Sequence, residues 1–215
     1  MTIANVKTGA SYVLTLAFLG SALGFVGYAV LLPVSKAQEP KADALPIIKI
    51  VRQVGDGKIT IRQSDKETIN GKAVKAEDVK AANGKDGVLE LRGKDAWVIE
   101  VKELPGIIQN GDGHIIVTDV KAKVVKIIHE GKGDVRFAGS ADELNIIYSG
   151  SGSLDCRMLK VKTASIVHQG SGDVLVNSEE LKVVLSKTGN VRYLGSPKVE
   201  DVVEGTGTVA PFKDK

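Results

Sequence analysis

Cysteine and aromatic residues are scarce in this sequence. Of its 215 residues, one is cysteine, Cys156, and 4% are aromatic. A single thiol excludes an intrachain disulfide framework, and the shortage of aromatic rings means that Val, Ile and Leu must supply the core. Neither sign of charge is in clear excess, since 29 basic residues accompany 26 acidic ones. A field this weak gives no basis for steering nucleic acid or other polyanions to the chain.

Glycine is plentiful, and it recurs in one short phrase, a Gly-x-Gly turn followed by two apolar positions that are separated by one residue. Copies of the phrase occupy residues 111–115, 131–135, 150–154, 170–174, 188–191 and 205–209. Their second glycines, at positions 113, 133, 152, 172, 189 and 207, are 20, 19, 20, 17 and 18 residues apart. A repeat of this length is typical of a solenoid, in which short units stack on one another.

Apolar residues keep fixed places relative to the second glycine of each copy. They stand two and four residues after it, and again eight and six residues before it. Such alternation is typical of strands whose every second side chain faces inward. We therefore predict an all-β fold, a single-stack parallel β-helix or solenoid over residues 111–215, with rungs about 4.8 Å apart. Asp201 is the exception, in the last rung, where a solenoid needs a polar cap.

The preceding part of the chain, residues 46–110, is less regular. Apolar runs predict strands over residues 47–51, 58–62, 88–91 and 96–101, and Gly55-Asp56-Gly57 predicts a hairpin between the first two. Residues 72–82 fit a brief helix or an irregular loop. We expect this part to supply irregular early rungs or a cap, with Trp97 packed under a strand. Residues 38–45 are polar, contain Pro40 and are predicted to be a linker.

The N-terminal segment, residues 1–37, holds the longest apolar run. Residues 11–34 are 24 uncharged and mostly apolar residues, enough for a membrane span of roughly 20. Ser35-Lys36-Ala37 also fits a signal-peptidase cleavage site. We predict an N-terminal transmembrane or signal helix. Both alternatives export the rest of the chain, to an inner-membrane-anchored periplasmic position or to the cell surface, and make the membrane a partner of the N-terminal segment.

Two columns of residues are candidates for a contact surface. Four residues before the second glycine stand His129, Tyr148 and His168, which predict either a stacked internal ladder or a strip that binds sugar or peptide. Five residues before it stand Ile128, Ile147, Val167, Val184 and Val202. If the positions on both sides face inward, this second column points outward. It is then an exposed apolar stripe that contacts a partner, unless residues 46–110 cover it or a bend buries it.

Polar residues form a further column directly after the second glycine. They are His114, Asp134, Ser153, Asp173, Asn190 and Thr208. Residues of these types hydrogen-bond to nearby backbone and stabilise turns, whereas a calcium site needs neighbouring carboxylates. We recognise no metal-ligand cluster, nucleotide loop or catalytic triad, and so predict no cofactor, no metal and no catalytic residue. Cys156 lies on an inward row and is expected to be a small buried residue.

Three phrases resemble the bacterial autotransporter adhesin head domain known as the GIN domain. They are Gly-Lys-Gly-Asp-Val at 131–135, Gly-Ser-Gly-Asp-Val at 170–174 and Tyr-Leu-Gly-Ser-Pro at 193–197, followed by a last Gly-Thr-Gly-Thr-Val. The resemblance is clearest over residues 111–210. It departs at Ser153, which stands where Asp is usual, and at Lys187, where the first glycine is lost. What it implies is an exported β-helical envelope protein.

Three functions are open at this stage. The leading prediction is a non-enzymatic, envelope-associated scaffold or contact module, whose partner is an envelope protein, a glycan or a second copy. The second is a carbohydrate-binding or carbohydrate-acting protein, which would need converging carboxylates from residues 46–110. The third is a scaffold that polymerises head to tail, although Asp201, Glu204 and the charged C-terminus disfavour an open end.

Overall fold

All secondary structure in the described part of the chain is β. The structure is a computed structural model, and it describes residues 12–15, 30–33, 48–73, 87–104 and 106–213. It divides into two units, Met1–Ala44 and Leu45–Lys215. The predicted all-β class is thereby confirmed for these residues.

The first unit contains two short strands, β1 (Tyr12–Thr15) and β2 (Val30–Pro33), which pair antiparallel. They are the described part of the predicted anchor or signal segment. The rest of that segment and the predicted linker lie outside the described residues. Among the residues that the structure describes, no helix is long and apolar enough to cross a membrane. The N-terminal transmembrane or signal helix therefore stays a prediction.

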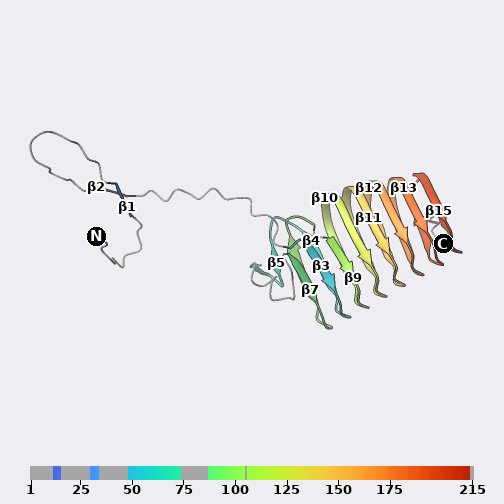
Figure 1. Ribbon diagram of the computed structural model, residues 1–215, viewed down its shortest axis with the longest axis horizontal. Coiled ribbons are helices and arrows are strands. Elements are labelled where there is room, and N and C mark those ends of the chain that lie inside the picture. The colour runs from blue at the N-terminus through green and yellow to red at the C-terminus, as the bar shows by residue number, and fades with distance from the viewer. Residues whose placement is uncertain (1–11, 16–29, 34–47, 74–86, 105, 214–215) are drawn as a thin grey trace, which may run out of the picture. The chain divides into compact units, whose positions relative to one another are not determined.

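The second unit is a parallel β-solenoid, whose strands β10 to β13 and β15 stand side by side in Figure 1. In chain order its strands are β3 (Ile50–Gln53), β4 (Ile59–Gln63), β5 (Thr68–Ile69), β6 (Lys72–Ala73), β7 (Val88–Leu91), β8 (Trp97–Val101), β9 (Gly106–Gln109), β10 (Ile115–His129), β11 (Val135–Tyr148), β12 (Leu154–His168), β13 (Asp173–Leu185), β14 (Asn190–Tyr193), β15 (Lys198–Val203) and β16 (Val209–Pro211). Strands β10 to β13 are long because each contributes to two faces of the coil. The first half of β10 pairs with β4 and its second half with β9.

Side chains from successive rungs pile into columns inside the coil. Val135 pairs with Leu154, which pairs with Val174, and all three are completely buried. The other inward positions of the central rungs are also buried, Phe137 and Cys156 among them. Burial raises the pKa of the Cys156 thiol, so this residue is an apolar part of the core. The predicted inward rows are confirmed for the rungs up to β14, whereas in the last rung Val209 is half-buried and Pro211 is exposed. Asp201, the exception, is exposed beside Val183.

The early strands do not stack in the order of the sequence. Strand β3 pairs with β7 on one side and β9 on the other, while β4 lies between β8 and β10, and all these pairings are parallel. The rung made by β3 and β4 is therefore inserted between the two rungs that follow it in the chain. The predicted hairpin at Gly55-Asp56-Gly57 is wrong. This turn is a corner of the coil, with the Gly113 amide donating to the Gly55 carbonyl.

A small hairpin covers part of the N-terminal end of the stack. Strands β5 and β6 pair antiparallel, and β5 also pairs antiparallel with β8, so the β8 edge is not left free. The Thr68 hydroxyl donates to Glu100 at 2.9 Å across this contact. A covered edge cannot add another strand. Trp97, at the start of β8, is partly buried against the core as predicted; residues 74–82 of the predicted helix or loop lie outside the described residues.

Candidate functional site

A column of polar side chains lines the inside of the glycine corners; we call it the corner column. Its members are Gln53, Gln109, His129, Tyr148 and His168. None exposes more than 1% of its surface. Each stands four residues before the second glycine of its corner and contacts the carbonyl of that glycine. The contact distances are 3.1 Å from Gln109 to Gly113, 2.8 Å from His129 to Gly133 and 2.9 Å from His168 to Gly172. The corner column therefore satisfies carbonyl groups that the turns would otherwise leave unpaired.

The three rings of the corner column form a stack. The His129 and Tyr148 ring centroids are 4.8 Å apart with 23° between their planes, and those of Tyr148 and His168 are 4.5 Å apart with 36°. A stacked internal ladder was one of the two sequence-based alternatives, and the structure has it. The other, a strip that binds sugar or peptide, is wrong for these residues because they are completely buried.

Burial also fixes the protonation of these rings. It is the main cause that lowers the pKa of His129 and of His168, and it raises the pKa of Tyr148 to about 12. A carbonyl oxygen can only accept, so the Nε2 atom of each histidine carries the proton. The amide of Gly170 in turn donates to Nδ1 of His168 at 3.4 Å. All three rings are thus neutral donors inside the protein and have no access to a substrate.

The corner column explains why glycine recurs at the corners. A Cβ atom added at Gly150 would lie 2.5 Å from Nδ1 of His129, and one added at Gly172 would overlap the hydroxyl of Tyr148. The ring of one rung therefore occupies the space that a side chain on the next corner would need. Neither glycine has a positive φ, so close packing, and not an unusual backbone angle, requires glycine here.

The residue before each member of the corner column faces outward, and together these residues form the apolar stripe. It consists of Ile108, Ile128, Ile147, Val167, Val184 and Val202, paired in register on neighbouring strands. The exposed fraction is 52% for Ile147, 39% for Val167, 46% for Val184 and 55% for Val202. Ile108 and Ile128 are half-buried. Residues 48–73, 87–104 and 106–110 extend the stack and leave these side chains exposed. These residues therefore do not cover the stripe, and no bend buries it.

Polar residues border the apolar stripe on both sides. One border consists of Lys126, Asn145, Ser165, Lys182 and Glu200, and the other of Asn110, Glu130, Ser149, Gln169, Ser186 and Glu204. At its N-terminal end the stripe meets Arg52, which pairs with Ile108 and forms a 3.7 Å ion pair with Glu90. The stripe is thus one residue wide and, over five rung steps, about 24 Å long.

The polar column after the second glycine connects neighbouring rungs. The amide of Ser153 donates to Asp134 at 3.0 Å, and Asn190 donates through its side chain to Asp173 at 2.9 Å. The Thr208 hydroxyl donates to Asn190 at 2.8 Å. These residues stabilise turns, although they bond to the next corner of the stack and not to their own. Among the residues that the structure describes, no three His, Cys, Asp or Glu side chains are grouped so as to hold a metal ion.

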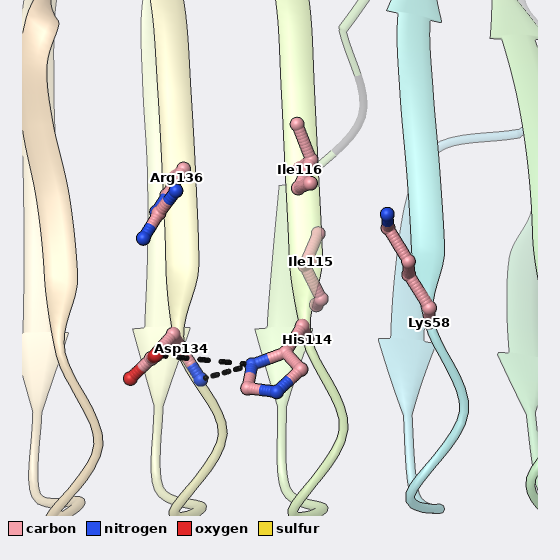
Figure 2. A pocket seen from close by; sticks show the side chains of 6 residues that line it. All are labelled: Lys58, His114, Ile115, Ile116, Asp134 and Arg136. Atoms are coloured by element: carbon pink, nitrogen blue, oxygen red, sulfur yellow. Dashed lines mark hydrogen bonds and ion pairs between the residues drawn. The ribbon is translucent and has the colours of Figure 1, made fainter.

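An open groove lies beside this polar column, between β4 and β11 (Figure 2). It is lined by Lys58, His114, Ile115, Ile116, Asp134 and Arg136. Figure 2 shows His114 turned toward Asp134, whose amide donates to His114 Nδ1 at 3.2 Å. The imidazole and the carboxylate are 3.9 Å apart. The lining includes no serine, threonine or cysteine, so no hydroxyl or thiol nucleophile lies beside this histidine in the groove.

Comparison with protein families identifies the chain. A family described as "putative auto-transporter adhesin, head GIN domain" matches residues 49–197. The chain belongs to the head GIN domain family. The matched range covers the solenoid from β3 to the corner after β14. The resemblance expected from the glycine phrases is confirmed, and it extends further toward the N-terminus than those phrases indicated.

Two solved structures are similar to this GIN-domain chain. A crystal structure of a putative adhesin from Bacteroides fragilis is 20% identical, with a TM-score of 0.52, and the match covers 77% of this chain and 92% of that one. A crystal structure of a putative lipid binding protein from Parabacteroides distasonis is 17% identical, with a TM-score of 0.48, and the match covers 77% and 93%. At 20% identity the first similarity shows the fold alone. No curated protein matches the chain.

Two features of the GIN-domain site were missed in the sequence. Gln53 and Gln109 belong to the corner column, and Ile108 belongs to the apolar stripe. The signal was present, since both glutamines stand four residues before the second glycine of a Gly-Asp-Gly turn, as His129 stands before Gly133. The Gly-Asp-Gly turn at residues 55–57 is identical to the one at residues 111–113. Aligning both turns with the later glycine phrases would have assigned Gln53 and Gln109 to the corner column and Ile108 to the apolar stripe.

Proposed function

We propose that this chain is a non-enzymatic contact module of the cell envelope, and that it binds another envelope protein through the apolar stripe. The observation that carries the proposal is the exposure of aliphatic side chains on neighbouring rungs, in register and with no covering element among the residues that the structure describes. Exposed single apolar residues are ordinary, but a continuous row of them marks a contact site.

The chemistry of the stripe favours a protein partner over a glycan. Sugars are commonly bound by aromatic faces with polar groups beside them, and the rings of this region are buried in the corner column. Ile147, Val167 and Val184 offer only aliphatic surface. A narrow stripe about 24 Å long suits an elongated apolar partner, such as the apolar face of one helix or a row of side chains on a second sheet.

The absence of enzymatic activity is part of the proposal. A carbohydrate-acting site needs two carboxylates placed across a sugar bond. Two of the outward carboxylates are instead bound to neighbours: Asp155 accepts from Arg157 at 2.8 Å, and Asp142 from Lys162 at 2.8 Å. These contacts lower the pKa of both carboxyl groups, which keeps them charged and unsuited to donate a proton at neutral pH.

Export and tethering complete the proposal. The apolar run at residues 11–34 is long enough to anchor the chain in a membrane or to direct its secretion. Family membership fits a surface-associated protein, since the family is described as an adhesin head domain. A solenoid held near the membrane would then present its apolar stripe to proteins of the same compartment.

Site-specific photo-crosslinking in cells tests the proposal. A photoreactive amino acid replaces Val167 on the apolar stripe or, as the control, Leu175, an outward residue on the other face of the coil. We expect a discrete adduct with one envelope protein from position 167 and none from position 175. Equal labelling from both positions, or an adduct of twice the mass of the chain, would overturn the assignment of the partner.

Binding of the purified chain to the purified crosslinked protein then measures the affinity of the contact. The variant Ile147→Thr/Val167→Thr/Val184→Thr keeps β-branched residues in the strands and removes apolar surface. We expect its affinity for the crosslinked protein to fall at least tenfold. The control Val98→Thr/Leu175→Thr changes two outward apolar side chains on the other face of the coil and should bind like the parent chain. An unchanged affinity of the stripe variant would contradict the proposal.

A further inference from the structure

The bend of the coil opposite the glycine corners carries two columns of charged and polar residues with different patterns. In the first column Lys123, Asp142, Lys162 and Glu179 follow one another on successive rungs. Positive and negative charges alternate, with Lys162 and Asp142 2.8 Å apart. Adjacent rungs are about 4.8 Å apart, so each charge in this column is attracted to the opposite charges on the rungs beside it. The positive and negative charges of the column therefore cancel.

The second column, which we call the basic column, has no acidic member. In register along the stack it reads Lys121, Ser140, Lys160 and Asn177. At its N-terminal end the Gln63 side chain bonds to the backbone of Lys121 and of Lys102, and Lys102 stands one residue beyond Val101, the register partner of Gln63. Lys121 and Lys160 are thus two rungs, about 10 Å, apart, and the uncharged Ser140 lies between them. All three lysines are exposed, and none forms an ion pair within the described part of the chain.

The backbone under the basic column is held in place by one side chain. The Gln63 amide donates to the carbonyls of Lys102 and Lys121, both at 3.1 Å, and its oxygen accepts from the Lys121 amide at 2.7 Å. Gln63 therefore fixes the separation of two lysines in rungs on either side of it. A fixed spacing reduces the entropy that a ligand must remove when it binds several lysines together.

An open groove runs beside the basic column. Its lining includes Lys102, Lys121, Ser140 and Lys160. Two acidic residues also line it, Asp119 and Asp65. Asp119 is neutralised by Arg62, whose Nε lies 2.9 Å from the carboxylate. Asp65 is exposed at the N-terminal end of the groove. Within this groove the stretch from Lys121 to Lys160 is therefore basic, while Asp142 and Glu179 line the adjoining groove with the same two lysines.

We propose that the basic column binds a linear acidic polysaccharide that carries one carboxylate or sulfate on every second sugar. An extended sugar chain repeats on a length similar to one rung, so alternate acidic sugars meet alternate lysines. The neutral sugar between Lys121 and Lys160 faces the Ser140 hydroxyl, and the one beyond Lys160 faces the Asn177 amide, which also donates to the Arg157 carbonyl. This site is separate from the apolar stripe and does not depend on the partner proposed there.

Binding of hyaluronate decasaccharides to the full chain tests this inference, since these carry one carboxylate on every second sugar. The measurement is calorimetric titration at low and at physiological salt. We expect binding that weakens with salt and falls at least tenfold in Lys121→Gln/Lys160→Gln. Ser140→Asp, which places a negative charge between the two lysines, should have an equal or larger effect. Neutral dextran of similar length should not bind.

A matched control separates the site from net charge. Lys126→Gln/Lys132→Gln removes the same charge from exposed lysines elsewhere on the rungs and should leave the affinity unchanged. Equal losses in the two double variants would overturn the inference, because the attraction would then be general. Binding to vesicles of phosphatidylcholine and phosphatidylglycerol, with none to hyaluronate, would also overturn it and identify a membrane surface as the ligand.

Discussion

The corner column and the apolar stripe are one residue apart in the sequence and have opposite chemistry. His129, Tyr148 and His168 are polar or aromatic and completely buried, whereas Ile128, Ile147 and Val167 precede them and face solvent. In most half-buried strands the apolar side chains face inward and the polar ones outward. The pattern is reversed at this edge of the coil.

The inward-facing polar side chains have a structural reason. Each corner-column side chain satisfies a glycine carbonyl, and the rings fill the space left by the glycines. The outward-facing apolar residues have no such reason, because Ile147 and Val167 satisfy no polar group of the fold and are bordered by polar residues on both sides of the stripe. What folding does not require is the better candidate for function. Substitutions at adjacent positions can separate the two roles.

The largest difference is expected when a charge is introduced on each side of the strand. Ile166 exposes 2% of its surface and Val167 39%. Ile166→Asp buries an unpaired carboxylate and should cost more than about 4 kcal/mol, enough to unfold a marginal chain. Val167→Asp should cost about 1 kcal/mol or less. Urea denaturation followed by circular dichroism measures both. Similar losses in the two variants would mean that β12 does not alternate as described.

The next largest effect is expected at Tyr148, in the middle of the ring stack. Tyr148→Ala removes the ring from both histidines and should cost about 3–5 kcal/mol. Tyr148→Phe keeps the stack but leaves the Gly152 carbonyl unpaired, at about 1–3 kcal/mol. Ile147→Ala, on the exposed side, is the control and should cost less than either. If Tyr148→Phe has no effect on thermal unfolding, the hydroxyl does not stabilise the corner.

The sequence predicted the repeat and the inward columns because both are local. Alternation around each glycine depends on neighbouring residues, and so Val135, Leu154 and Val174 were placed correctly. The insertion of β3 and β4 between later rungs was not predictable in this way. Periodicity indicates which residues form a rung, but the order of rungs depends on long-range pairing.

The candidate site was predicted in part for the same reason. The outward direction of Val184 followed from alternation, whereas its exposure depended on where residues 46–110 fold. The burial of His129 could not be predicted from the sequence, because it depends on the Gly133 carbonyl that accepts its hydrogen bond inside the corner. The spacing of Lys121 and Lys160 in the basic column appears only when their rungs, which differ in length, are aligned on each other.

A moderate, pH-dependent effect is expected at the two histidines of the corner column. Their folded-state pKa values are lowered by burial, against about 6.5 in the unfolded chain. Above that pH they add no pH dependence. As the pH falls below it, the unfolded chain takes up protons more readily, and stability decreases until the folded-state pKa is reached. Nearby Asp134 and Asp173 offset part of this effect.

Glutamine is the matched replacement for these histidines, because Gln53 and Gln109 hold the same place in earlier rungs. His129→Gln/His168→Gln should keep its free energy of unfolding nearly constant between about pH 7 and pH 5, while the parent chain loses stability. Chemical denaturation at several pH values measures the slope. The exposed His114 remains in both proteins, so an equal slope in the two would show that the buried rings do not titrate.

The smallest effect on stability is expected on the apolar stripe, and this prediction bears most directly on function. Val167→Thr/Val184→Thr changes two side chains that are 39% and 46% exposed, and the free energy of unfolding should change by about 0.5 kcal/mol or less. Thermal unfolding measures it beside the binding assay. Retained stability with lost binding would show that the apolar stripe serves binding, whereas the corner column serves the fold. A loss of several kcal/mol would instead show that the fold needs these valines, and the argument that they are kept for a partner would fail.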